Sequence, residues 1–168
     1  MQRFTVAVLV KNQFGVLNRV TSMFRRRQFN IVSLTVSETE SPDLSRITVL
    51  FDGEDGTKQQ LINQLYKLPD VCSIKELQND ESVCRELLLI KLKNEPDTRA
   101  EIRDAAAAFN AKTVDYTLDS IIMQLTGDSR RIDDFINLMR AYTILEICRT
   151  GVVSLERGNS TIRKVNYL

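Results

Sequence analysis

The chain has 168 residues, of which 43% are hydrophobic and 27% charged, and its net charge is +1. The length suits one domain or two small ones, and the near-zero charge excludes a general attraction for nucleic acid or for an anionic membrane. Histidine is absent, which removes the commonest general base and the commonest nitrogen ligand of metal ions. No apolar run approaches the ~20 residues that span a bilayer, and no signal peptide precedes the first strand pattern, so we expect a soluble, cytoplasmic protein.

Strand and helix patterns in the first half occur in the order β-α-β-β-α-β. Alternating or β-branched apolar runs predict strands over residues 3–10, 31–37, 46–51 and 71–77. Apolar positions at helical spacing predict two helices, the first with Val16, Leu17, Val20, Met23 and Phe24 and the second with Leu61, Ile62, Leu65 and Leu68. This order is that of the ferredoxin-like fold.

The same order repeats after about 80 residues. Strand patterns cover residues 83–93, 112–116, 121–126 and 144–155, the last of them interrupted at Gly151, and two helical stripes lie between them. Asp128 precedes the second of these helices and is expected to cap it. The sequence therefore predicts an α+β protein of two tandem ferredoxin-like βαββαβ domains.

We place the first domain at residues 1–78, a polar linker at 79–82, the second domain at 83–158 and an aperiodic, mobile tail at 159–168. When both helices cover one face of a four-stranded sheet, the other face is left open. In the first strand that face carries Thr5, Ala7 and Leu9. Open apolar faces of this kind pair with another sheet or another chain, so we expect a dimer or larger assembly formed through sheets or strand edges.

The three cysteines are Cys72, Cys84 and Cys148. They are widely spaced, odd in number and set in apolar strand-like runs, which favours reduced thiols in the core of a cytosolic protein. No residues with the spacing of metal ligands are visible, so no metal site is expected.

The turn from Asn12 to Leu17 is the one candidate site. Gly15 permits a tight turn, and the free N–H groups at the start of the following helix suit a carboxylate or a phosphate. The N–H groups of Gly15, Val16 and Leu17 would hold an α-carboxylate, and the side-chain oxygen of Asn12 would accept a hydrogen bond from an α-ammonium group. The alternative interpretation is purely structural, with Asn12 as a helix cap and Gly15 as a turn residue.

Asn30 is predicted at the opposite end of the same helix and cannot easily meet Asn12 within one small domain. Across a symmetric dimer interface, however, Asn30 of one chain can face the Gly15 turn of the other. The alternative is that Asn30 only ends the helix.

Catalytic interpretations have little support. The chain lacks both glycine-rich nucleotide motifs, and Ser45 and Ser154 have no histidine to activate them. The acidic clusters at 38–40 and 52–55 lie beside turn residues, which favours solvated loops. An RNA-recognition domain has this strand order too, but its sheet needs stacking aromatic residues that these strands do not supply. We therefore assign no catalytic residue.

Several long motifs resemble the small regulatory subunit of acetolactate synthase, also called acetohydroxyacid synthase. In the first half they are V-L-V-K-N-Q-F-G-V-L-N-R-V and F-N-I-V-S-L-T-V-S-E-T-E-S-P-D-L-S-R-I-T-V. In the second half they are R-E-L-L-L-I-K-L, V-D-Y-T and R-T-G-V-V-S-L-E-R-G. The resemblance extends from Arg3 to Gly158. Phe14 and Gln28-Phe29 depart from the residues that are commoner in the family.

The resemblance implies that the first domain is an ACT domain, a βαββαβ module that binds amino acids at a dimer interface. It implies a non-catalytic subunit of a transferase holoenzyme of branched-chain amino acid biosynthesis. Such a subunit binds a large catalytic partner, raises its activity and confers feedback inhibition, most often by valine. The chain itself would hold no cofactor, whereas the partner would carry thiamine diphosphate, Mg²⁺ and FAD. The effector site maps onto Asn12, Gly15, Val16 and Leu17 of one chain and Asn30 and Ile31 of the other.

The sequence is compatible with two other functions. One is a free-standing ACT-type amino-acid sensor that acts on another partner, such as a transcription factor, although no helix-turn-helix or basic stripe is present. The other is a ferredoxin-like enzyme, against which the missing histidines and scattered carboxylates count.

Overall fold

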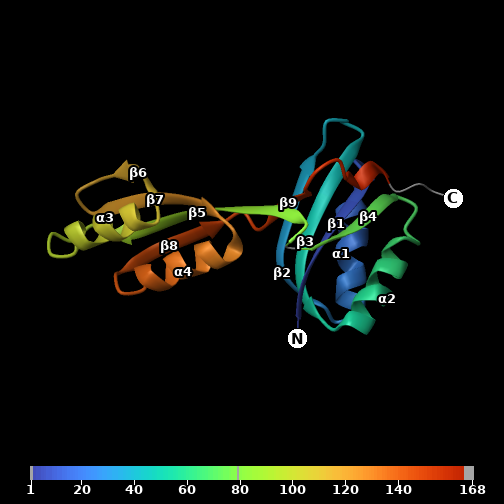
Figure 1. Ribbon diagram of the computed structural model, residues 1–168, viewed down its shortest axis with the longest axis horizontal. Coiled ribbons are helices and arrows are strands. Elements are labelled where there is room, and N and C mark those ends of the chain that lie inside the picture. Colours follow the sequence, from blue (N-terminus) through green and yellow to red (C-terminus); the bar gives the residue numbers. More distant parts are fainter. Residues whose placement is uncertain (1, 79, 165–168) are drawn as a thin grey trace. The chain divides into compact units, whose positions relative to one another are not determined.

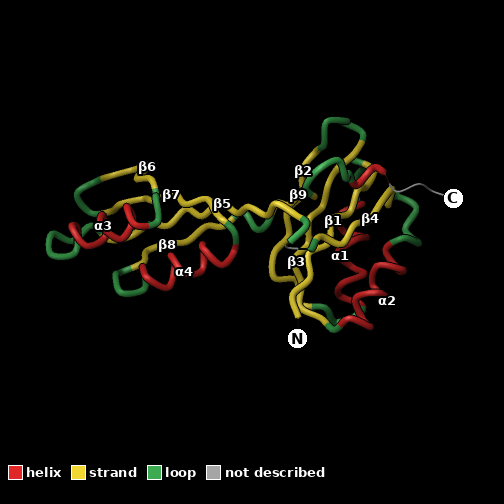
Figure 2. Tube along the Cα trace, in the orientation of Figure 1, coloured by secondary structure: helices red, strands yellow, loops and turns green. Residues whose placement is uncertain are grey.

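The computed structural model describes residues 2–78 and 80–164, which form two compact units. The first unit contains the residues up to 83 together with those from 152 onward, and the second contains residues 84–151. Figures 1 and 2 show that each unit is a sheet with its two helices on one face. The two-domain α+β prediction is thereby confirmed.

The first unit is a four-stranded antiparallel sheet in the order β2-β3-β1-β4. Its elements are β1 (Gln2–Lys11), α1 (Val16–Arg26), β2 (Asn30–Glu38), β3 (Leu44–Gly53), α2 (Asp55–Leu65) and β4 (Val71–Leu77). This is the strand order of the ferredoxin-like fold, with β1 and β3 in the centre and β2 and β4 at the edges. The apolar positions of the sequence pattern fill the space between sheet and helices, as Val6, Val20 and Leu61 illustrate by being fully buried.

A cluster of phenylalanines closes one end of this core. The ring centre of Phe51 lies 5.5 Å from that of Phe24 and 5.2 Å from that of Phe29, both in edge-to-face geometry. Such pairs add to the stability gained from burial alone. The cluster ties the end of α1 to the start of β2, and so fixes where Asn30 emerges.

The second unit repeats the topology with the order β6-β7-β5-β8. Its elements are β5 (Ser82–Lys93), α3 (Arg99–Ala108), β6 (Lys112–Tyr116), β7 (Ser120–Gly127), α4 (Ser129–Met139) and β8 (Ile144–Arg149), the first two residues of β5 belonging to the first unit. Asp128 caps α4 as expected, because its Oδ1 accepts a hydrogen bond of 2.8 Å from the backbone N–H of Arg131. The prediction that the cysteines lie in the core is wrong, since these free thiols are exposed at Cys148 and only half-buried at Cys72 and Cys84.

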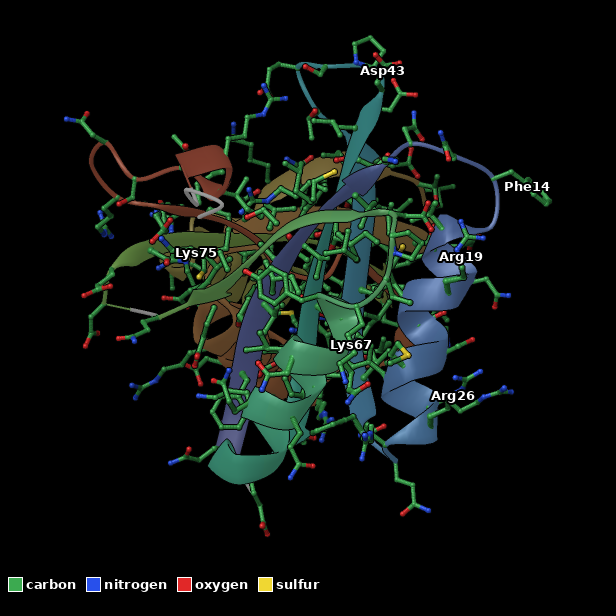
Figure 3. All side chains as sticks on the ribbon, turned by 90° about the vertical axis from the view of Figure 1, so that its right-hand side faces the viewer. Phe14, Arg19, Arg26, Asp43, Lys67 and Lys75 are labelled. Carbon is green, nitrogen blue, oxygen red and sulfur yellow. The ribbon has the colours of Figure 1, made fainter. Side chains whose placement is uncertain are left out.

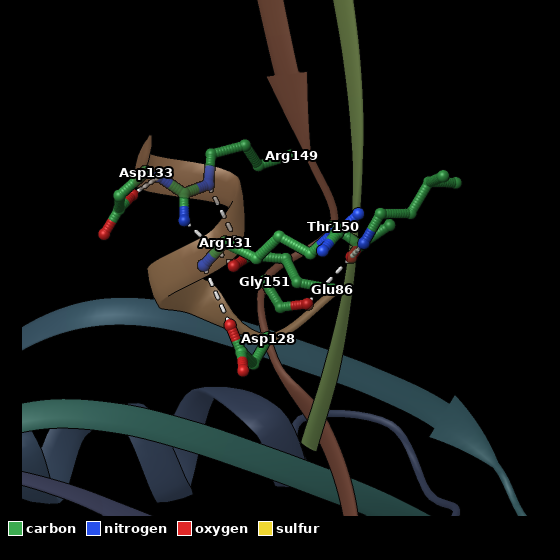
Figure 4. A network of polar contacts seen from close by, with 8 residues as sticks. Glu86, Asp128, Arg131, Asp133, Arg149, Thr150 and Gly151 are labelled. Carbon is green, nitrogen blue, oxygen red and sulfur yellow. Dashed lines mark hydrogen bonds and ion pairs between the residues drawn. The ribbon is translucent and has the colours of Figure 1, made fainter. Parts of the chain in front are cut away.

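A polar network lies where β5, β8 and α4 of the second unit meet (Figure 4). The guanidinium of Arg149 donates to both carboxylate oxygens of Glu86 at 2.9 Å, and to Asp133 at 2.8 Å. The Glu86 side chain is only 3% exposed, so Arg149 supplies its counter-charge inside the fold. The hydrogen bond to Glu86 raises the pKa of Arg149, an effect that burial opposes and Asp133 reinforces.

By their contacts, residues 152–158 and the described part of the tail belong to the first unit, whereas the sequence prediction places residues 83–158 in one domain. The predicted last strand stops at Arg149 and Gly151 turns the chain with a φ of 80°. The strand β9 (Val153–Glu156) and the 3₁₀ helix η1 (Ile162–Lys164) follow, and both contact β4. We call residues 153–163 the C-terminal segment. Residues 165–168 of the predicted tail, and Asn79 of the predicted linker, lie outside the described residues.

The C-terminal segment covers part of the sheet face that the sequence left open. We call this the outer face of the first sheet. Thr5, Ala7 and Leu9 are 8%, 0% and 4% exposed on it, respectively. This face is therefore no longer a reason to expect a partner chain. The expectation of a partner rests instead on the outer edge of strand β2, with which no described strand pairs.

Candidate functional site

The turn before α1 has the geometry that an anion site needs. Gly15 adopts a left-handed conformation with φ of 80°, which glycine reaches without a steric penalty. The first helical hydrogen bond runs from Arg19 N–H to the Gly15 carbonyl, and the Val16 N–H turns back to Gln13 at 3.3 Å. In the described part of the chain no side chain caps the helix, and the first turn of the helix holds no acidic residue. The N–H groups of Leu17 and Asn18 are therefore left without an acceptor among the described residues, at the positive end of the helix dipole.

A basic side chain lies next to this turn, as Figure 3 shows for Arg19. Arg19 donates to Asp70 at 2.8 and 2.7 Å, which holds the guanidinium over the loop. A Cβ atom added at Gly15 would lie 3.3 Å from Arg19 Nη1. The helix start, which favours a carboxylate, thus lies close to a guanidinium whose charge is shared with Asp70.

The Asn12 side chain does not cap the helix, so the structural interpretation of this residue is wrong. Its Nδ2 donates to Glu38 Oε1 at 3.1 Å and to the Pro42 carbonyl at 2.9 Å. The Asn12 backbone N–H also donates to the Asp43 carbonyl at 2.7 Å. Both amide hydrogens are used by the β2–β3 hairpin, and the side-chain oxygen is left to accept a hydrogen bond, as the prediction for an ammonium group requires.

Asn30 and Ile31 lie apart from this turn. They begin β2, after the far end of α1, and the eleven residues of that helix span about 16 Å at 1.5 Å per residue. One chain thus brings together Asn12, Gly15, Val16 and Leu17, but not the other two predicted residues. Asn30 is the first residue of a strand and pairs with Asp52, so it does not cap the helix.

The sequence analysis missed two residues of this site. Arg19 was assigned no role, and Glu38 was interpreted as part of a solvated loop. A signal for Arg19 existed, because it stands four residues after Gly15 and so lies one helical turn above the glycine. Glu38 is 26 residues from Asn12 and meets it only through the folded hairpin.

Apolar side chains are exposed both at this turn and along β2. Phe14 at the tip of the turn is fully exposed (Figure 3), and Leu17, Val32 and Val36 are each about 40% exposed. Among the described residues no group of acidic, cysteine or histidine side chains is placed to hold a metal ion. No helix in the same residues is long and apolar enough to cross a membrane.

Two family models cover the chain. One is described as the small subunit of acetolactate synthase and matches residues 85–158, and the other as the AHAS small subunit-like ACT domain and matches residues 6–73. The acetolactate synthase small subunit of Bacillus subtilis is 43% identical over 155 residues, which are 91% of this chain and 90% of that protein. That of Mycolicibacterium smegmatis is 43% identical over 154 residues, which are 92% and 91% of the two chains.

A solved structure agrees over the same length. The acetolactate synthase small subunit of Thermotoga maritima superposes with a TM-score of 0.86 at 36% sequence identity, and the match covers 95% of this chain and all of that one. Family models, full-length relatives and fold thus agree with the motifs of both halves. The chain belongs to the family of acetolactate synthase small subunits.

Proposed function

We propose that the chain is the regulatory, non-catalytic subunit of acetolactate synthase in branched-chain amino acid biosynthesis. It binds the large catalytic subunit, raises its activity and makes it subject to feedback inhibition by valine or a related amino acid. The thiamine diphosphate, Mg²⁺ and FAD of the reaction belong to that large subunit. The observation that carries the proposal is the uncapped α1 turn in a chain whose relatives over nine-tenths of its length are acetolactate synthase small subunits.

The effector is an α-amino acid held at the start of α1. Its carboxylate binds the N–H groups at the start of α1, among them the Leu17 N–H that has no described acceptor, with the guanidinium of the Arg19–Asp70 pair nearby. Its ammonium group donates to the side-chain oxygen of Asn12, beside the carboxylate of Glu38. Its aliphatic side chain packs on Val16 and Leu17 and on Ile31 of a second copy, while Asn30 of that copy completes the polar contacts.

The exposed edge of β2 supports a dimer formed through the ACT domains. In the described part of the chain no strand pairs with the outer edge of β2, which leaves a row of backbone groups able to extend the sheet. Antiparallel pairing of two β2 strands about a two-fold axis brings the first residue of one strand beside the last residue of the other. These residues are Asn30 and Glu38, and Glu38 already contacts Asn12. The dimer would thus assemble the two halves of the effector site.

A series of contacts links the effector turn to the end of the chain. Asn12 is bound to the β2–β3 hairpin through Glu38 and Pro42. On the same hairpin, Arg163 pairs with Glu40 at 2.9 Å and donates to Ser41 Oγ at 3.0 Å. An amino acid that moves Asn12 therefore acts on the C-terminal segment through one hairpin. A shift of this hairpin is enough for the coupling free energy typical of allosteric proteins, which is about 1–3 kcal/mol.

Reconstitution with the large catalytic subunit tests the function. We expect addition of this chain to raise acetolactate formation, and valine, leucine or isoleucine to lower it again. An unchanged rate with the chain would reject the regulatory role. A raised rate that no branched-chain amino acid lowers would reject the feedback part alone.

Titration calorimetry with valine tests the site. Gly15→Asp places a carboxylate where that of the ligand is proposed to lie, and Gly15→Asn is its matched control, because asparagine tolerates a positive φ and adds no charge. We expect Gly15→Asp to abolish detectable binding and Gly15→Asn to weaken it less. Undiminished binding by Gly15→Asp would contradict the site assignment.

A free-standing amino-acid sensor is the alternative function. Affinity purification from the native cell distinguishes the two, since a regulatory subunit retains a large thiamine-diphosphate enzyme and a free-standing sensor does not.

A further inference from the structure

A cavity of about 450 Å³ lies between the outer face of the first sheet and the C-terminal segment. All of its lining residues belong to the first unit, so it is a feature of one compact body. It is separate from the α1 turn, because α1 packs on the opposite face of the sheet and Gly15, Val16 and Leu17 do not line it. Its volume is within the usual range for small-molecule sites.

The sheet forms the floor of this cavity. Arg46 on β3 is paired with Ser37 on β2 and with Leu9 on β1, so the three side chains lie in one row on the outer face. Lys75 and Leu77 reach the same face from β4, opposite Ala7 and Thr5. The floor is therefore apolar at Leu9 and Leu77, which are both 4% exposed, and cationic at Arg46 and Lys75.

The C-terminal segment forms the roof and is held by three contacts with the sheet. Arg46 Nη2 donates to the Ser154 carbonyl at 2.7 Å, Lys75 pairs with Glu156 at 3.0 Å, and Ser73 Oγ donates to the Ile162 carbonyl at 2.7 Å. Leu155 and Ile162 add apolar surface from this side. A cavity fixed by such contacts on both sides is preformed, which lowers the cost of binding a ligand.

Of the cations that line the cavity, all but one form a salt bridge with a described carboxylate. Lys75 has Glu156 as its partner, and Arg163 has Glu40. Arg46 makes no salt bridge with a described carboxylate, and the Ser154 carbonyl is the acceptor found for its guanidinium in that part of the chain. Burial lowers the pKa of Arg46, and only part of this effect is offset by the charges of Glu156 and Glu40. A half-buried guanidinium with unused donors is suited to bind a carboxylate through two hydrogen bonds.

We propose that this cavity binds a small aliphatic monocarboxylate, with its carboxylate on Arg46 and its hydrocarbon tail against Leu9, Leu77 and Leu155. The lining contains as many carboxylates as cations, but Arg46 is the one of its cations without a salt bridge to a described carboxylate, so its guanidinium has donors left for the ligand. A phosphate ester fits less well, because its second charge would face the carboxylates of Glu40 and Glu156. The site takes no ammonium group and is distinct in position from the amino-acid site proposed at the α1 turn.

The test is a titration of the full chain with 3-methylbutanoate, followed by NMR of labelled leucine and isoleucine methyl groups. We expect saturable shifts at Leu9, Leu77 and Ile162, and an affinity at least about tenfold lower in Arg46→Gln, since charge-assisted hydrogen bonds are lost. The uncharged 3-methylbutan-1-ol, which has the same hydrocarbon tail, should not bind. The variant Gly15→Asp, which disables the proposed effector site, should bind 3-methylbutanoate as the wild type does.

Several outcomes would overturn the proposal. They are no saturable shift at up to about 10 mM ligand, equal binding of the alcohol, equal binding by a folded Arg46→Gln, and loss of binding in Gly15→Asp. The last outcome would place the carboxylate at the α1 turn. Shifts at the three methyl groups are measured on the wild type, so they decide the location even where Arg46→Gln does not fold.

Discussion

Replacing Arg149 with methionine should destabilise the second unit strongly. Methionine keeps the length and apolar stem of the side chain but removes the guanidinium. Glu86 would then keep its carboxylate, 3% exposed, without either of the two hydrogen bonds of 2.9 Å that it accepts from Arg149 (Figure 4). A buried charge that has lost its partner still carries the free-energy cost of desolvation, but no longer has the attraction of the opposite charge to offset it.

The expected loss is about 2–3 kcal/mol in the free energy of unfolding. Removing one partner of a fully buried pair costs ~3–5 kcal/mol, and we take less because the Arg149 side chain is 34% exposed and water can reach the vacated position. In a domain of this size, 1 kcal/mol corresponds to about 4–8 °C in the melting temperature. The transition of the second unit should therefore fall by about 10–20 °C.

Thermal unfolding of the full chain by circular dichroism measures this loss, and hydrogen exchange at β5 and β8 assigns it to the second unit. Asp133→Asn is the matched control, because Asp133 bonds the same guanidinium but is 45% exposed, and it should cost less than about 1 kcal/mol. The double variant Glu86→Leu, Arg149→Met should recover part of the lost stability, because it also removes the buried carboxylate that has no partner. An Arg149→Met variant no less stable than Asp133→Asn would refute this reasoning.

Three further changes should each affect stability through one named contact. Asp128→Ala removes the cap of α4 and should cost about 1 kcal/mol in denaturant unfolding. Phe51→Ala opens a cavity beside Phe24 and Phe29 and should cost ~3–5 kcal/mol in the same assay. A chain that ends after Arg157 loses the contacts of Ser73 and Arg163, so amides of β4 should exchange faster with solvent while those of α4 do not change.

The elements of both units follow from side-chain periodicity, but the path of the chain after Arg149 does not. Residues 144–155 alternate in a way that suits one strand, and the sequence prediction treated Gly151 as an interruption within it. In the structure the φ of 80° at Gly151 ends β8, and residues 153–156 join the first unit. Alternation indicates which side chains of a strand point to the same side, but it does not indicate which sheet the strand joins.

The candidate site was predictable where it depends on local geometry and not where it depends on long-range contacts. Gly15 predicts a turn at the start of a helix, and it can adopt the left-handed conformation because it has no Cβ. The role of Asn12 was ambiguous in sequence, because asparagine is favoured at helix caps and also hydrogen-bonds other backbone groups. Its hydrogen bonds to Glu38 and Pro42 settle that choice through the β2–β3 hairpin, which no local pattern reveals.

That hairpin is the element through which the two proposed sites of the first domain would influence one another. One side of it, through Glu38 and Pro42, holds the Asn12 turn. Its other contacts, through Glu40 and Ser41, hold Arg163, and residues 37–40 line the outer cavity. A ligand at the α1 turn and a carboxylate at Arg46 would therefore compete or cooperate through the same few residues. That coupling is reciprocal, because each ligand must change the affinity of the protein for the other ligand by the same factor.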